Sequence, residues 1–135
     1  MPKPVLYIDL DGVVANYGAA DHSTRHRAGF FLGLAPIAGA VAAVTRLSER
    51  YDVYFLSTAP WSNVHAWSEK RQWLEDHFGE VAFKRLILSH NKGLLRGDFL
   101  VDDRIANGVE NFQGVHLHFA TEEFPDWDAV EHRLA

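Results

Sequence analysis

The hydrophobic positions of the chain fall into short apolar runs that alternate with segments of helical spacing. The runs are rich in β-branched and aromatic residues, as expected of buried strands. They lie at Val5 to Asp9, Val53 to Ser57, Arg85 to Leu88, Phe99 to Asp102 and Val115 to Phe119. Because strands that alternate with helices form parallel β-α-β units, the pattern predicts a three-layer α/β/α sandwich, with a central parallel sheet and helices on both faces.

Two segments between these runs have the pattern of amphipathic helices, Ala38 to Arg50 and Val64 to Phe78. Their apolar side chains recur near helical spacing at Val41, Val44 and Leu47 in the first, and at Trp67, Trp73, Leu74 and Phe78 in the second. Pro36 suits the first turn of the earlier helix, where a missing N–H costs nothing. The only irregular stretch long enough to be an insertion runs from about Tyr17 to Leu34.

The length of 135 residues fits a single domain, so residues 1–135 are expected to share one core and one site. Hydrophobic residues make up 47% and charged residues 23%, a balance typical of globular proteins rather than disordered or membrane proteins. No apolar run approaches the roughly 18 residues of a membrane span. A core strand that begins at Val5 leaves no room for a signal peptide, which predicts a cytoplasmic protein.

The charge and the cysteine count exclude two further classes. The formal net charge is -5 and no Lys/Arg block is present, so the chain is not expected to bind long nucleic acid through phosphate contacts. A small basic pocket remains compatible with this charge. Cysteine is absent, which excludes disulfides and thiol chemistry.

Two carboxylates follow the first predicted strand, in the sequence Asp9-Leu10-Asp11-Gly12-Val13. In extended backbone both would lie on one side of the strand, where their repulsion would raise a pKa unless a cation lay between them. Oxygen ligands of this charge suit Mg²⁺, which takes one or two carboxylates together with water and phosphate oxygens. The alternative is an ordinary turn, in which Asp and Gly are common.

The ends of two other predicted strands are also polar. The fourth strand ends in Asp102 and Asp103, and the second is followed by Thr58 and Ala59, which offer a hydroxyl and a turn backbone. Lys92, in the loop before the fourth strand, can bring a positive charge to the same place. Since ligands of parallel sheets bind outside the carboxyl ends of the strands, these groups are expected to meet there.

The order of these segments resembles the four motifs of the haloacid dehalogenase superfamily. The motifs are Asp-Leu-Asp-Gly-Val, Leu-Ser-Thr-Ala-Pro, Lys92 and Val-Asp-Asp. More narrowly, the chain resembles the 5′(3′)-deoxyribonucleotidase family. That likeness rests on Phe30 to Ala43 leading into Asp52 to Pro60, on Glu69-Lys70 with Trp73 and Phe78-Gly79, and on the spacing from Lys92 to Asp102-Asp103-Arg104.

The resemblance implies a magnesium-dependent phosphomonoesterase that forms an aspartyl phosphate on Asp9. It implies that Asp11 protonates the leaving oxygen and later activates water. Thr58 and Ala59 would bind the phosphate, and Lys92 would neutralise it together with Asp9. The metal ligands implied are the Asp9 carboxylate, the Asp11 carbonyl and Asp103, with Asp102 behind them. Lys70 fits a supporting role at the site and a solvated helix face equally well.

The insertion departs from the family, whose members carry a sizeable helical cap between the first two motifs. Here the corresponding cap is only about residues 17–34. Tyr17 matches a position at which the family places an aromatic ring against the base, and Phe30 and Phe31 are candidates for an apolar wall. Trp61 is a candidate to replace the missing cap aromatics, although an exposed or core ring explains it equally well. The eight histidines, His22 and His26 among them, form no metal-ligand pattern and are expected at the surface.

Three functions remain open. The first is a 5′-nucleotidase-like phosphatase with a small phosphorylated substrate, a (deoxy)nucleoside monophosphate. The second keeps the chemistry but opens the site to a larger substrate, such as a sugar phosphate, a peptide or a nucleic-acid end, with a homo-oligomer as one way to close it. The third is a binding module without turnover, which the intact Asp9 and Asp11 disfavour.

Overall fold

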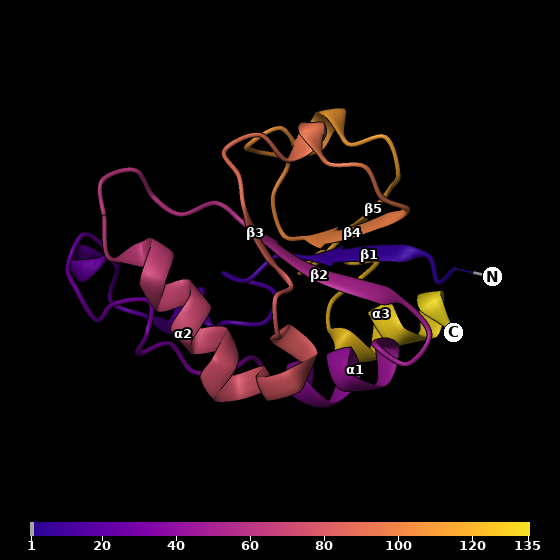
Figure 1. The fold of residues 1–135 in the computed structure, drawn as a ribbon, viewed down its shortest axis with the longest axis horizontal. Coiled ribbons are helices and arrows are strands. Elements are labelled where there is room, and N and C mark those ends of the chain that lie inside the picture. The colour runs from indigo at the N-terminus through magenta and orange to yellow at the C-terminus, as the bar shows by residue number, and fades with distance from the viewer. Residues whose placement is uncertain (1) are drawn as a thin grey trace.

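The computed structural model, which describes residues 2–135, has a five-stranded sheet at its centre (Figure 1). The strands are β1 (Val5–Ile8), β2 (Asp52–Ser57), β3 (Leu86–Leu88), β4 (Phe99–Asp102) and β5 (Val115–His118). They pair in the order β3-β2-β1-β4-β5, and every pair is parallel. The predicted parallel α/β sheet is therefore confirmed, with each strand within a residue or so of its expected bounds.

Three α-helices cover one face of the sheet: α1 (Ala40–Leu47), α2 (Ala66–Phe78) and α3 (Trp127–Leu134) (Figure 1). In the part of the chain that the structure describes, the opposite face carries no α-helix and only the 3-10 helices Lys92–Leu94 and Val109–Asn111. The connections on that side, residues 89–98 and 103–114, are too short for a full crossover helix with its loops. The third layer of the expected sandwich is thus made of short turns.

The structure differs from the sequence expectation at both ends of the helical layer. Helix α1 begins at Ala40, directly after Gly39, which has a left-handed backbone with a φ of 79°. Pro36 therefore lies before the helix and not in its first turn as expected. Pro36 pairs instead with Ala15 in an isolated bridge. Helix α3 was not expected, although Asp126 caps it by accepting a hydrogen bond from the Ala129 N–H.

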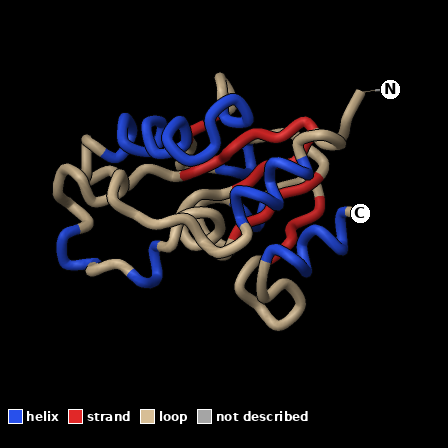
Figure 2. The backbone as a smooth tube through the Cα atoms, turned by 90° about the horizontal axis from the view of Figure 1, so that it is seen from below, coloured by secondary structure: helices blue, strands red, loops and turns tan. Residues whose placement is uncertain are grey.

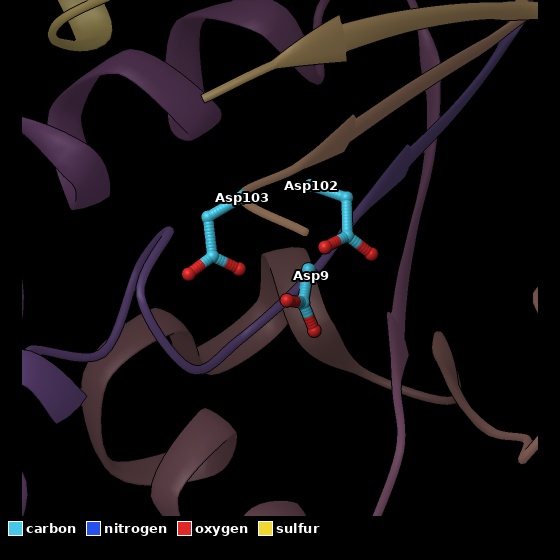
Figure 3. A group of neighbouring side chains, drawn as sticks. All are labelled: Asp9, Asp102 and Asp103. Carbon is cyan, nitrogen blue, oxygen red and sulfur yellow. The ribbon is translucent and has the colours of Figure 1, made fainter. Parts of the chain in front are cut away.

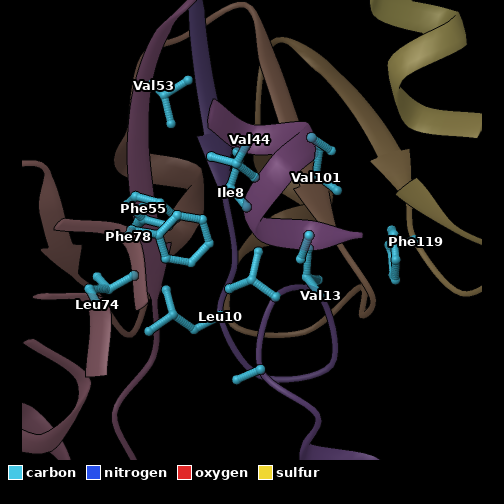
Figure 4. Packing of buried hydrophobic residues seen from close by; sticks show 14 of the residues in the cluster. Ile8, Leu10, Val13, Val44, Val53, Phe55, Leu74, Phe78, Val101 and Phe119 are labelled. Atoms are coloured by element: carbon cyan, nitrogen blue, oxygen red, sulfur yellow. The ribbon is translucent and has the colours of Figure 1, made fainter. Parts of the chain in front are cut away.

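The core divides at the sheet according to the alternation of strand side chains. On the helical face, Ile8, Phe55 and Val101 belong to a large cluster that includes residues of α1, α2 and α3 (Figure 4). On the other face, a smaller cluster consists of Tyr7, Leu56, Leu100, Val109 and Phe112. Because both faces are buried, a shift of one residue would expose the wrong side chains, and the strand register is firmly set.

The insertion of residues 17–34 is mostly loop, with two short 3-10 helices, Tyr17–Ala19 and His22–Thr24. Figure 2 shows that such loops and turns gather at the end of the molecule away from both termini. We call residues 17–34 the cap segment. Within residues 2–135, no helix is long and apolar enough to cross a membrane.

Candidate active site

Acidic side chains gather where the strand order of the sheet reverses. The chain runs outward from β1 through β2 to β3 and then crosses to β4 on the other side of β1. Asp9 follows β1, Asp102 ends β4 and Asp103 follows it. One carboxylate oxygen of each lies within 4.8 Å of the other two (Figure 3). This is the switch point at which parallel sheets bind ligands.

Lys92 forms ion pairs with two of these carboxylates, and it lies on the face of the sheet away from the α-helices. Its Nζ lies 2.6 Å from Asp102 Oδ2 and 3.1 Å from Asp9 Oδ1, and the side chain is only 3% exposed. Burial opposes the charged form of Lys92, but Asp9 and Asp102 outweigh it and raise the pKa of the amine. The ammonium group is therefore held charged beside the acidic group.

One positive charge does not balance three carboxylates. Burial raises the pKa of Asp9 to about 7, with Asp102 and Asp11 adding to the effect and Lys92 opposing it. Burial also raises the pKa of Asp103 to about 6, with a further contribution from Asp9. Asp103 Oδ1 is buried and has no hydrogen-bond partner among the described residues. A divalent cation would supply both the missing charge and the missing partner, so the donor set fits a hard metal ion.

Gly12 lets the loop after β1 approach Asp103. Its φ is 82°, in the left-handed region that side chains rarely adopt. A Cβ atom at this position would lie 2.8 Å from Asp103 Cγ and would collide with Oδ2. The glycine is therefore required by the close packing of the loop on the acidic group.

Asp11 lies outside the group of three and pairs with a buried lysine of α2. Lys70 Nζ donates to Asp11 Oδ2 at 2.6 Å and lies 4.4 Å from the ring centroid of Phe31. The Lys70 side chain is 1% exposed, so the solvated helix face considered for it is wrong. Lys70 does not itself line the cleft described next, but it contacts two residues that do, Asp11 and Phe31.

A cleft of about 320 Å³ opens over the carboxyl ends of the strands. The residues expected at the site that line it are Asp9, Asp11, Tyr17, Thr58, Ala59, Lys92, Asp102 and Asp103. Thr58 Oγ1 donates to the Ser89 carbonyl at 2.7 Å. Phe31 also lines the cleft, whereas Phe30 packs behind it with ring centroids 4.8 Å apart. Every residue expected to catalyse, bind substrate or bind metal therefore lines the cleft, except Lys70.

The cleft also includes residues that the sequence did not single out. Trp61, considered only as a replacement for cap aromatics, lines it with 81% of its surface exposed. His90, Arg104 and Asn107 line it as well. His90 lies in the loop after β3, whereas Arg104 and Asn107 lie in the loop after β4. Of the three, only Arg104 belongs to a sequence motif, the one that begins with Asp102-Asp103.

Two histidines of β5 support the acidic group from behind. His116 Nε2 donates to the Asp102 carbonyl at 2.9 Å, and His118 Nε2 donates to the Asp103 carbonyl at 3.0 Å. Both rings are half-buried, so the expectation that all histidines lie at the surface is wrong for this pair. Burial lowers the pKa of His116. The neutral ring with a proton on Nε2 can still donate this bond.

The cap segment is tied to α2 rather than packed as a separate helical unit. The Glu69 carboxylate accepts hydrogen bonds from the N–H groups of Gly29, Phe31 and Leu32 at 2.6, 3.2 and 3.4 Å. Asn63 Nδ2, just before α2, donates to cap carbonyls on Arg25 and Arg27. The cap therefore forms a fixed wall of the cleft, beside Asp11.

A parallel sheet with a carboxylate cluster at its switch point, a buried lysine and a neighbouring hydroxyl defines a haloacid dehalogenase-like phosphohydrolase. Comparison with known sequences narrows this class. Residues 21–125 match the family described as 5′ nucleotidase, deoxy (pyrimidine), cytosolic type C protein. The chain belongs to this family of phosphatases.

Individual relatives agree with the family assignment. The chain is 43% identical to a putative 5′(3′)-deoxyribonucleotidase of Vibrio phage KVP40, an alignment that covers 95% of this chain and 82% of the relative. It is 35% identical to the cytosolic 5′(3′)-deoxyribonucleotidase of Homo sapiens, covering 76% of this chain and 46% of the relative. It is 26% identical to the 5′(3′)-deoxyribonucleotidase of Bacillus subtilis, covering 77% and 64%. The chain thus spans most of the phage relative but less than half of the human one.

Proposed function

We propose that this chain hydrolyses the phosphomonoester of (deoxy)nucleoside monophosphates with the help of Mg²⁺. The observation that supports this most directly is the acidic group of Asp9, Asp102 and Asp103 joined by Lys92, next to the Thr58 hydroxyl. The names of the relatives supply the substrate class, because they describe those proteins as 5′(3′)-deoxyribonucleotidases.

The proposed reaction has two displacements on phosphorus. First, a carboxylate oxygen of Asp9 attacks phosphorus, the bond from phosphorus to the ester oxygen breaks, and Asp11 gives its proton to the leaving nucleoside oxygen. Next, water attacks the aspartyl phosphate while Asp11 accepts a proton from it. The bond between phosphorus and Asp9 then breaks, which releases inorganic phosphate, restores Asp9 as a carboxylate and leaves Asp11 protonated for the next cycle. Lys70, which holds one oxygen of Asp11, is proposed to position this acid and base.

The phosphate is proposed to lie between Thr58 and Lys92. The Thr58 hydroxyl now donates to a backbone carbonyl, so it would turn its hydrogen toward a phosphate oxygen when substrate binds. The Ala59 backbone N–H is proposed as a second donor, and the Lys92 ammonium would neutralise charge on the phosphoryl group. Phosphoryl transfer depends mainly on such positioning and charge stabilisation.

Mg²⁺ is proposed to bind the carboxylates of Asp9 and Asp103 and the carbonyl of Asp11. Asp102 is less suited to direct binding, because its Oδ2 accepts from Lys92 and its Oδ1 from the Arg104 N–H. It would instead hold Lys92 in place. When bound, the ion supplies positive charge to the carboxylates and to the phosphate oxygens.

The nucleoside part is proposed to contact the cap wall formed by Tyr17 and Phe31. One observation favours a second candidate, a larger phosphorylated substrate or a second copy of the chain that completes the cap: residues 17–34 contain no α-helix and leave the cleft open. The cytoplasm is proposed as the site of action, since the human relative is named as a cytosolic type.

The test is Asp9→Asn with phosphate release measured over nucleoside monophosphates, sugar phosphates and phosphopeptides. The substitution keeps the shape of the side chain but removes the attacking charge, so turnover should fall at least about 1,000-fold with the unfolding temperature maintained. Asp76→Asn, at an exposed position of α2, is the matched control. Turnover near that of the wild type in Asp9→Asn would reject the covalent mechanism. A preference for phosphopeptides or sugar phosphates would select the second candidate.

A further inference from the structure

The side chain of Trp61 is a large apolar ring that lines the cleft and is exposed to solvent. It is 81% exposed, whereas Trp73 and Trp127 are 1% and 2% exposed. It lies three residues after Thr58, within about 10 Å of that residue even along a fully extended chain. A scattered surface tryptophan needs no explanation, but this one lines the same cleft as the proposed phosphate site.

Two other rings hold Trp61 without covering it. Its ring centroid lies 6.2 Å from that of Trp67 on α2 and 5.8 Å from that of His90, with interplanar angles of 75° and 70°. His90 is itself held, because its Nε2 donates to the Ala59 carbonyl at 3.0 Å. Neither neighbour lies parallel to the indole, so most of the ring surface remains available for a flat partner.

Tyr17 differs from Trp61 in this respect. Its ring contacts those of His22, Phe30 and Phe31, with centroid distances of 4.3, 5.8 and 6.4 Å. The ring is therefore engaged within the cap segment, and it offers less free surface for stacking than Trp61 does.

We propose that Trp61, held by Trp67 and His90, is the platform on which the base of the substrate stacks. This inference rests on the proposed nucleotide substrate and moves base binding from the cap to the loop after β2. Every base has a π-face, so such a platform binds the base by stacking and does not select among bases. Tyr17 and Phe31 then form the facing wall.

The experiment compares a deoxynucleoside 5′-monophosphate with 2-deoxyribose 5-phosphate, which has the same phosphoester but no base. Trp61→Ala should lower kcat/KM for the nucleotide roughly 5- to 150-fold, the range expected from the loss of one stacked base. The change for the sugar phosphate should be about twofold or less. Trp61→Phe, which keeps a ring, should recover most of the nucleotide activity. Val64→Ala, in the same loop and 75% exposed, is the matched control.

A binding measurement gives a second readout that does not depend on turnover. In an Asp9→Asn background, the nucleotide should quench the tryptophan fluorescence, and 2-deoxyribose 5-phosphate should not. Trp61→Phe in that background should remove most of the quenching, because the other tryptophans are less exposed than Trp61.

The outcomes separate this inference from the proposed function. If the wild type hydrolyses no nucleotide, the proposed function fails and the platform fails with it. In a second outcome, the wild type hydrolyses nucleotides while Trp61→Ala lowers kcat/KM equally for both substrates, or for neither. The platform is then rejected and the proposed function stands. A loss for both substrates together with a change in sedimentation would identify Trp61 as a contact between copies of the chain, which also overturns the platform.

Discussion

Close packing constrains one residue of the site that takes no part in the chemistry, Gly12. The Asp103 carboxylate occupies the space that a side chain at position 12 would need. The glycine in Asp-Leu-Asp-Gly therefore links the loop after β1 to the end of β4. His116 and His118 add a second constraint by holding the carbonyls of Asp102 and Asp103.

Gly12→Ala should therefore weaken both the fold and the metal site. The left-handed backbone costs a side chain about 1–2 kcal/mol, and the collision with Asp103 adds to this cost. We expect a lower free energy of unfolding by at least that amount and a higher Mg²⁺ concentration for half-maximal activity. Thermal unfolding and metal titration measure the two effects.

Gly18→Ala is the control for this prediction, because an added Cβ there would meet open space. If Gly12→Ala matched the Gly18 variant in both measurements, the packing of the loop on Asp103 would not be a constraint in solution.

At the scale of elements, α2 connects the cap to the chemistry. Two adjacent residues of this helix have opposite charges and different roles. Glu69 accepts hydrogen bonds from three N–H groups of the cap, and Lys70 donates one to Asp11. The Lys70 ammonium also lies over the ring of Phe31, a cap residue. A short cap without α-helices can remain ordered because Glu69 and Lys70, in one turn of α2, both contact it.

Glu69→Gln tests this connection. Hydrogen bonds to a charged acceptor are each worth about 1.5–3 kcal/mol, and the amide gives up the charge and one acceptor oxygen. The cap should open more often, so trypsin should cleave faster after the exposed Arg25 and Arg27, and KM for the nucleotide should rise.

Glu75→Gln provides the comparison on the same helix, since Glu75 is exposed and pairs only with Arg71 and Gln72 at the surface. Trypsin should cleave this variant at the wild-type rate. Equal digestion rates and KM values for both variants would show that Glu69 does not hold the cap.

At the scale of the whole molecule, the fold is stabilised unequally on the two faces of its sheet. The helical face carries the large cluster, to which α3 contributes Trp127 with 2% exposure. The Trp127 indole N–H donates to the Val13 carbonyl at 2.8 Å, which ties the C-terminal helix to the loop that bears Asp11. The stability of the last helix and the shape of the site are therefore linked.

Trp127→Ala should destabilise the protein by about 3–5 kcal/mol, the usual cost of removing a buried aromatic side chain. Arg46→Ala, which breaks the solvent-exposed ion pair between Arg46 on α1 and Glu131 on α3, should have a much smaller effect on the free energy of unfolding. Urea unfolding gives both values. Similar losses in the two variants would mean that α3 contributes little to the cooperative core.

The hydrophobic pattern alone determined the strands, the helices α1 and α2 and the parallel arrangement, because burial on both faces demands continuous apolar runs. The motif order also determined which residues gather at the carboxyl ends of the strands, from Asp9 to Asp103. Helix α3 was missed, although the spacing of its buried Trp127, Val130 and Leu134 follows the helical period.

Other features depend on contacts between segments distant in sequence, which no local pattern encodes. Only the folded chain separates Asp11 from the acidic group and buries Lys70 against it, since residues 59 positions apart meet there. Only the β4–β5 register brings His116 and His118 to the acidic carbonyls. Tertiary packing likewise decided that Trp61 is exposed and that the Tyr17 ring packs against other rings of the cap segment. The position of a ring along the chain does not determine which other rings cover it.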